Sequence, residues 1–117
     1  MKYMLLIYTD ESTWQDPAQA EAMMGEYMTF TQGIVDSGEW VAGDPLEGRE
    51  SATTVRVRDG STLTTDGPFA EVKEHIAGYY IVDVKDLDRA LELAAKIPDA
   101  RGAGIEVRPI RDMGMPS

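Results

Sequence analysis

Residues 65–84 read TDGPFAEVKEHIAGYYIVDV, and this stretch decides the fold that the sequence predicts. The turn Asp66-Gly67-Pro68-Phe69 leads, through a short polar link, into a run that is apolar at both alternating sets of positions. Because successive side chains of a strand point to opposite faces of its sheet, such a run predicts a strand that is covered on both faces. We therefore expect residues 76–84 to form a central strand.

The segment before this turn has the pattern of a β-hairpin. Two runs rich in Thr and Val, residues 53–58 and residues 61–65, flank Asp59-Gly60. Asp-Gly is favoured in two-residue type I′ turns, where both residues take a positive φ. The sequence therefore predicts a hairpin inserted directly before the central strand.

Two helices follow from capping residues and apolar periodicity. Asp16 and Pro17 suit the cap and the first position of a helix over residues 17–37, which carries one apolar stripe. Asp86 can cap a second helix over residues 86–97, and Pro98 ends it. The first stripe consists of Met23, Tyr27, Phe30 and Ile34.

Three further strands complete the expected fold. Residues 2–8 are again apolar in both registers and predict a second central strand, whereas residues 39–43 and 105–110 predict short strands. The order predicts an α+β domain of ferredoxin-like, split βαβ plan with an inserted β-hairpin, in which two helices cover one face of an antiparallel sheet. We expect one domain over residues 1–112 and a short tail over residues 113–117.

The charge and composition exclude several classes of protein. The 117 residues include 11 Lys and Arg against 21 Asp and Glu, a net charge of -10, which argues against binding of nucleic acid or an anionic membrane surface. The chain has no Cys and one His, so it lacks the ligands of the usual metal sites. We expect a cytoplasmic protein without a metal or cofactor.

The Asp66-Gly67-Pro68-Phe69 turn, with Lys73, Glu74 and Gly78, resembles the DGPF signature of the YCII-related proteins. The resemblance covers residues 2–110 and implies a homodimer in which two sheets pack face to face, as a dimeric α/β barrel. The doubly apolar central strands agree, because the sheet face without helices needs its own cover. Some YCII-type members resemble acid/base enzymes that pair a His of the first helix region with an Asp, and residues 17–37 contain no His.

The turn itself supplies the first candidate site. Gly67 can take a positive φ and Pro68 fixes its own φ, so the turn holds Asp66 rigidly. Asp66 would then act as a general base or hydrogen-bond acceptor at the mouth of a cleft, with Gly67, Pro68 and Phe69 contacting a ligand. Alternatively, Asp66 is a turn residue that hydrogen-bonds its own backbone.

The link after the turn adds three candidate catalytic residues. Lys73 could supply an electrophile and Glu74 a second carboxylate, although a solvated surface pair is the alternative. His75 is the only residue that could perform imidazole chemistry, and the alternative is a half-buried strand residue.

Other candidate ligand-binding residues lie elsewhere in the chain. Asp10 follows the first strand, where it could face a site or merely suit a loop. Tyr27 and Tyr79 combine an apolar ring with a polar tip and could bind a planar ligand, unless they belong to the core.

Three functions fit these residues. The first is a cofactor-independent lyase or isomerase that acts by acid/base catalysis on an oxygenated ring or lactone, with Asp66 in the cleft. The second is a non-catalytic ligand-binding or regulatory module that acts through protein partners, because relatives resemble accessory proteins encoded beside alternative sigma factors. In the third, the turn is purely structural.

Overall fold

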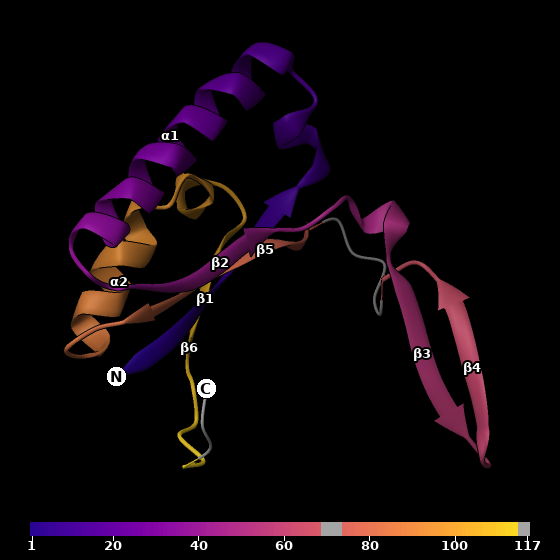
Figure 1. Ribbon diagram of the computed structural model, residues 1–117. Helices are drawn as coiled ribbons and strands as arrows, with labels where there is room; N and C mark the ends of the chain where they lie inside the picture. Colours follow the sequence, from indigo (N-terminus) through magenta and orange to yellow (C-terminus); the bar gives the residue numbers. More distant parts are fainter. Residues whose placement is uncertain (69–73, 115–117) are drawn as a thin grey trace.

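A computed structural model describes residues 1–68 and 74–114 and has the α+β, ferredoxin-like fold that the sequence predicts (Figure 1). Within the part of the chain that the structure describes, no helix is long and apolar enough to cross a membrane. The elements, including the 3₁₀ turns η1 to η3, are β1 (Lys2–Asp10), η1 (Glu11–Trp14), α1 (Pro17–Asp36), β2 (Trp40–Pro45), η2 (Arg49–Ser51), β3 (Thr53–Arg58), β4 (Ser61–Asp66), β5 (Glu74–Asp83), α2 (Leu87–Lys96), η3 (Pro98–Arg101) and β6 (Gly104–Pro109).

Four strands form an antiparallel sheet in the order β2-β5-β1-β6. The two runs that are apolar in both registers, β1 and β5, are the two central strands, as predicted. Leu5 pairs with Tyr80 and Ile7 with Gly78 in the register of these strands. Directly paired residues share a face of the sheet, so these side chains lie on the same side.

The helices α1 and α2 cover one face of the sheet, and the core lies between the helices and this face (Figure 1). On β1 the alternate residues Tyr3, Leu5, Ile7 and Thr9 are buried toward the helices. Most of the predicted α1 stripe is also buried. The buried core cluster comprises Tyr3, Leu5, Ile7, Phe30, Ile34, Tyr80, Val82, Val84, Ala90, Leu93, Ala94 and Ile97.

The opposite sheet face, here called the open face, carries no helix of residues 1–68 and 74–114 (Figure 1). Its side chains include Met4 and Leu6 of β1 and Ile81 of β5, and each is half-buried. Met4 pairs directly with Ile81, so the apolar residues of the two central strands lie side by side on this face.

Both helices begin at the predicted caps. The side chain of Asp16 accepts a hydrogen bond from the backbone N–H of Ala18, and Pro17 occupies the first turn of α1. The side chain of Asp86 accepts one from the backbone N–H of Arg89 at the start of α2. These bonds satisfy N–H groups that have no partner inside the helix.

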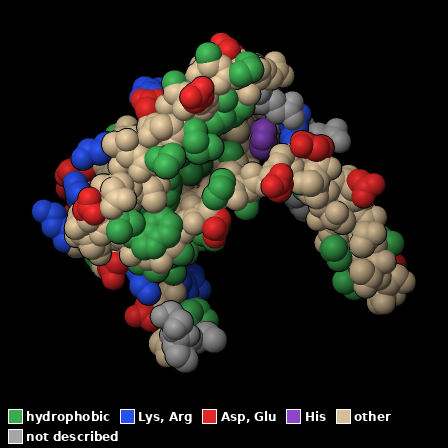
Figure 2. Space-filling model, turned by 45° about the horizontal axis from the view of Figure 1, so that its top comes forward, with side chains coloured by type: hydrophobic (Ala, Val, Ile, Leu, Met, Phe, Trp, Pro, Cys, Tyr) green, Lys and Arg blue, Asp and Glu red, His purple; other side chains and the backbone are tan. Residues whose placement is uncertain are grey.

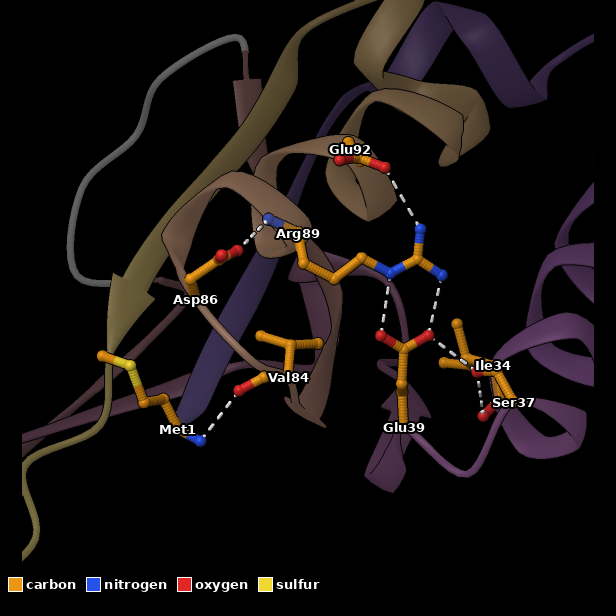
Figure 3. Close-up of polar contacts among 8 residues, drawn as sticks. All are labelled: Met1, Ile34, Ser37, Glu39, Val84, Asp86, Arg89 and Glu92. Carbon is orange, nitrogen blue, oxygen red and sulfur yellow. Dashed lines mark hydrogen bonds and ion pairs between the residues drawn. The ribbon is translucent and has the colours of Figure 1, made fainter.

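An ion pair connects the start of β2 to α2 (Figure 3). The guanidinium of Arg89 donates from Nε and Nη2 to the two carboxylate oxygens of Glu39, each at 2.8 Å. Ser37 Oγ donates to Glu39 Oε1 at 2.7 Å. These hydrogen bonds, that from Arg89 above all, lower the pKa of Glu39 to about 2.

The hairpin forms as predicted, but it stands apart from the four-stranded sheet. Strands β3 and β4 make a separate two-stranded sheet, which projects away from the body of the molecule (Figure 1). Asp59 and Gly60 have φ values of 51° and 77°, as a type I′ turn requires.

Candidate functional site

A hollow of about 440 Å³ lies between α1 and the strands β2 and β5, and we call it the α1 hollow. Figure 2 shows hydrophobic side chains gathered in the hollowed part of this face of the molecule. Five of the side chains that line the α1 hollow are aromatic. They are Trp14, Tyr27, Trp40, Tyr79 and Tyr80.

A chain of hydrogen bonds borders one side of this hollow. Trp14 Nε1 donates to Thr9 Oγ1 at 3.0 Å, and Thr9 Oγ1 donates to Asp99 Oδ1 at 3.0 Å. The hydroxyl of Tyr27 donates to the other carboxylate oxygen, Asp99 Oδ2. The chain therefore joins β1, η1, α1 and η3 through the carboxylate of Asp99.

Asp99 is 2% exposed, although a buried carboxylate is costly unless its oxygens are hydrogen-bonded. The direction of these hydrogen bonds follows from the groups involved. The indole N–H of Trp14 can only donate, so Thr9 Oγ1 accepts from it and donates its own proton to Asp99. Both oxygens of Asp99 thus accept hydrogen bonds, as an ionised carboxylate does.

Tyr27 is held in its protonated form by its surroundings. Burial raises its pKa far above the ordinary value of 10.0, and the hydrogen bond to Asp99 raises it further. Since the proton of Tyr27 points to Asp99, the lone pairs of its oxygen are the part available to a molecule in the hollow.

A second pair of hydroxyl groups lies further along α1. Thr31 Oγ1 donates to the backbone carbonyl of Tyr27 at 2.9 Å and lies 2.7 Å from the hydroxyl oxygen of Tyr80. Because the one proton of Thr31 is used, the hydroxyl of Tyr80 donates in this pair. Burial raises the pKa of Tyr80.

Two glycines let the chain approach closely along one wall of the α1 hollow. A Cβ on Gly78 would lie 2.9 Å from the backbone oxygen of Asp44, and one on Gly43 would lie 2.8 Å from the ring of Tyr80. Neither distance leaves room for a methyl group. The glycines therefore allow β2 and the Tyr80 ring to pack as they do.

A second hollow, also of about 440 Å³, lies beside the base of the hairpin, and we call it the His75 hollow. Pro68, Glu74 and His75 line it, together with Tyr8 and Arg49. The Nδ1 atom of His75 is buried and has no hydrogen-bond partner among the described residues. The structure thus brings three of the predicted site residues together here.

Asp66 and Gly67 of the DGPF turn have backbone roles in the structure. Asp66 is the exposed last residue of β4 and lines neither hollow. Gly67 has a φ of 105°, its N–H donates to the carbonyl of Ala52, and its carbonyl accepts from Thr54 Oγ1. Phe69 and Lys73 lie outside the described residues.

The remaining predicted site residues are Tyr27, Tyr79 and Asp10, and they lie in two different places. Tyr27 and Tyr79 both line the α1 hollow, and the hydroxyl of Tyr79 donates to Asp44 at 2.9 Å. Asp10 is the last residue of β1, which runs two residues further than the strand expected over residues 2–8. Its side chain caps η1 by accepting from the backbone N–H of Ser12. Asp10 thus makes a local cap at the end of β1, and it lines neither hollow.

Sequence reasoning missed Thr9, Trp14 and Asp99. Asp99 follows Pro98 directly after a helix, where an acidic residue reads as part of an exposed turn. One feature of the sequence points to Thr9. It lies two positions after Ile7, so its side chain continues the set of alternate β1 residues that are buried.

These features describe a small ferredoxin-like domain with an aromatic hollow and a buried carboxylate at its edge. The chain belongs to the YCII-related domain family, whose model matches residues 1–114. An uncharacterized protein of Rhizobium meliloti is 34% identical over an alignment of 115 residues, and the alignment covers 94% of this chain and 92% of that protein.

A solved structure shares the fold. The 5-chloro-2-hydroxyhydroquinone dehydrochlorinase of Burkholderia phenoliruptrix, in complex with 2,5-dihydroxybenzoquinone, superposes with a TM-score of 0.51. The match covers 95% of this chain and 94% of that chain at 12% sequence identity. This likeness concerns the fold alone.

Proposed function

We propose that the α1 hollow binds a small, planar, oxygenated molecule and that Tyr27 and Asp99 form an acid/base pair toward it. The observation that carries this proposal is the hydrogen-bonded pair itself, a buried carboxylate whose Oδ2 receives the proton of a phenol that lines the hollow. We assign to Asp99 the role of general base that the sequence suggested for Asp66, because Asp99 lines the α1 hollow and Asp66 lines neither hollow.

The pair can remove a proton from a bound hydroxyl group. The O–H bond of the ligand breaks as its proton passes to the phenol oxygen of Tyr27, while the proton of Tyr27 passes to Oδ2 of Asp99. The ligand becomes an oxyanion and Asp99 becomes a neutral acid, so charge and protons balance. The reverse transfer returns the proton at a later step, as acid/base catalysis of a lyase or isomerase requires.

The shape and chemistry of the hollow suit an aromatic or quinoid ring. The rings of Tyr27, Trp40 and Tyr80 line the hollow and can pack against a planar ligand in an offset or edge-to-face arrangement. A hydrogen bond between the hydroxyl groups of Thr31 and Tyr80 fixes the position of this pair. The fold neighbour was solved with 2,5-dihydroxybenzoquinone, which makes this compound a rational first probe.

Isothermal titration calorimetry with 2,5-dihydroxybenzoquinone and a set of simple phenols tests the proposal. We expect the wild type to bind at least one of these compounds and Tyr27→Phe to bind it roughly tenfold more weakly, as expected for the loss of one hydrogen bond to a polar ligand group. Asp66→Asn is the matched control and should bind like the wild type.

Two results would contradict this assignment. If Asp66→Asn loses binding and Tyr27→Phe retains it, the site lies at the DGPF turn. If binding survives both substitutions and no turnover occurs on prolonged incubation, the acid/base role is wrong and the chain is a ligand-binding module.

We also propose that two copies associate through their open faces. Met4, Leu6 and Ile81 form an apolar surface there that the chain's own helices leave uncovered. A second sheet packed on this surface would remove it from water, which is favourable by roughly 25 cal/mol for each Å² of apolar surface buried.

A further inference from the structure

The described side chains that line the α1 hollow include two carboxylates and no cation. The carboxylates are those of Asp44 and Asp99, and no Lys, Arg or His is among these lining residues. Arg101 lies in the same 3₁₀ turn as Asp99, but it does not line the hollow, and Glu26 accepts a hydrogen bond from its guanidinium at 2.8 Å. The hollow therefore favours a positively charged ligand over a negatively charged one, in a chain whose net charge is -10.

The hydroxyl groups that line the α1 hollow can only accept hydrogen bonds from a ligand. Each of them uses its one proton for a hydrogen bond within the protein, so only its lone pairs remain. These hydroxyl groups belong to Tyr27, Thr31, Tyr79 and Tyr80. A ligand must therefore supply the protons for hydrogen bonds to these four groups.

The aromatic rings of the hollow add a third feature that suits a cation. The ring of Trp14 packs near that of Tyr27 and the ring of Trp40 near that of Tyr80, with centroids 6.2 Å and 6.1 Å apart. Aromatic faces attract an ammonium group that lies within about 6 Å of the ring centroid. Aromatic rings, carboxylates and hydroxyl lone pairs together match the chemistry of a protonated amine.

The proposed proton transfer gives a further reason for a cationic ligand. When a ligand hydroxyl loses its proton to Tyr27, its oxygen becomes negative, and none of the described lining side chains has a positive charge to stabilise it. A ligand that carries an ammonium group supplies that charge itself, because opposite charges attract strongly where water is scarce.

We propose that the ligand of the α1 hollow is a hydroxyarene that carries a protonated amine, with its hydroxyl group at Tyr27 and its ammonium group at Asp44. This inference rests on the proposed function and names the class of its ligand. Asp44 suits the ammonium group because it lines the hollow and is exposed, so a charged group can reach it without losing all of its water. Asp99 is 2% exposed and both of its oxygens already accept hydrogen bonds.

Calorimetric titration at pH 7 with three phenols of matched size tests the charge preference. Tyramine carries an ammonium group, 4-propylphenol has a methyl group in its place, and 3-(4-hydroxyphenyl)propanoate has a carboxylate there. We expect tyramine to bind roughly tenfold more tightly than 4-propylphenol, as expected for an ammonium group among aromatic rings. The carboxylate should bind more weakly than 4-propylphenol, because it meets two aspartates and no cation among the described lining residues.

The variant Asp44→Asn tests the position of the ammonium group. Asn removes the charge but keeps an oxygen that can accept from the hydroxyl of Tyr79. It should lower the ratio of tyramine affinity to 4-propylphenol affinity by roughly two- to fivefold, as expected for the loss of an exposed ion pair. Asp66→Asn is the matched control, because it removes the same charge from a residue that lines neither hollow, and it should leave the ratio unchanged.

The inference is overturned if 4-propylphenol or the carboxylate binds the wild type as tightly as tyramine does. It is also overturned if Asp44→Asn and Asp66→Asn lower the affinity ratio equally, since the preference then reflects the net charge of the chain and not this hollow. When 4-propylphenol binds and Tyr27→Phe weakens it, but tyramine has no advantage, only this inference fails. When the wild type binds none of the three phenols and none of the compounds named for the proposed function, the proposed function fails as well.

Discussion

The hydroxyl of Tyr27 donates its proton to Oδ2 of Asp99, 72 positions further along the chain. Tyr27 comes from the third turn of α1 and Asp99 from the 3₁₀ turn after α2, and the hydrogen bond joins them beside the α1 hollow. The pair matters for stability as well as for the proposed chemistry, because it holds a buried carboxylate in place.

Tyr27→Phe should destabilise the fold. The substitution leaves Asp99 Oδ2 buried without its donor, and a lost hydrogen bond to a charged group costs about 1.5–3 kcal/mol. Urea unfolding measures the change. Tyr79→Phe is the matched control, since its hydrogen bond to Asp44 is exposed and its loss should change the free energy of unfolding by less than about 0.5 kcal/mol. If both variants lose the same free energy of unfolding, the buried hydrogen bond contributes no more to stability than the exposed one.

Thr9→Val should destabilise the fold through the same carboxylate. Val has the shape of Thr, but it can neither accept from Trp14 Nε1 nor donate to Asp99 Oδ1. Because both substitutions remove donors from Asp99, their effects should not add when Thr9→Val is combined with Tyr27→Phe. A double-mutant cycle in urea should give a coupling energy of about 0.5–3 kcal/mol. A coupling of zero would mean that the two donors act independently.

Glu39 should make folding stability depend on pH under acidic conditions. The pKa of Glu39 is about 2 in the folded chain, mainly because Arg89 hydrogen-bonds its carboxylate, against an ordinary value of 4.5. A lowered folded pKa means that this stabilisation is complete above about pH 4.5 and is lost as the pH falls toward 2.

Glu39→Gln removes the charge that titrates and nearly preserves the side-chain shape. Thermal melts between pH 2 and pH 5 should therefore show a shallower loss of stability in this variant than in the wild type. Glu92→Gln serves as the control, because its contact with Arg89 is a single exposed ion pair at 3.2 Å. Parallel profiles for wild type and Glu39→Gln would refute this role of the ion pair.

Two glycine substitutions should change stability in opposite directions. Gly78→Ala places a methyl group 2.9 Å from the backbone oxygen of Asp44, so β2 must shift, at a cost of about 1–3 kcal/mol. Gly25→Ala lies in the middle of α1, where a Cβ would meet no described heavy atom within 4 Å. It should stabilise the chain by about 0.5–1 kcal/mol, because Ala favours the helix more than Gly does. Thermal unfolding of both variants checks the signs.

Local patterns predicted the elements of the fold because the forces that form them act within a few residues. Asp16 and Asp86 cap their helices as expected, and Asp59-Gly60 makes the expected turn. The doubly apolar runs β1 and β5 occupy the centre of the sheet, since only central strands can bury side chains on both faces.

The candidate site was only partly predictable. Tyr27 and Tyr79 were identified as possible lining residues, and both line the α1 hollow. Asp66 is a candidate because of its turn, yet the structure makes it the exposed last residue of β4, at the base of the hairpin. Glu74 and His75, which follow the turn in the sequence, both line the His75 hollow.

The sequence by itself determined which segments form the six strands and two helices of the described chain, because caps, turn residues and side-chain alternation are local. Only the tertiary structure decided that Asp99 meets Tyr27 and Thr9, since no pattern within η3 reveals which distant donors its carboxylate will receive. It also decided that the hairpin of β3 and β4 stands free of the main sheet. Which groups pair with the edge of a strand or with a buried charge depends on how the helices pack on the sheet. That packing brings together residues far apart in the chain.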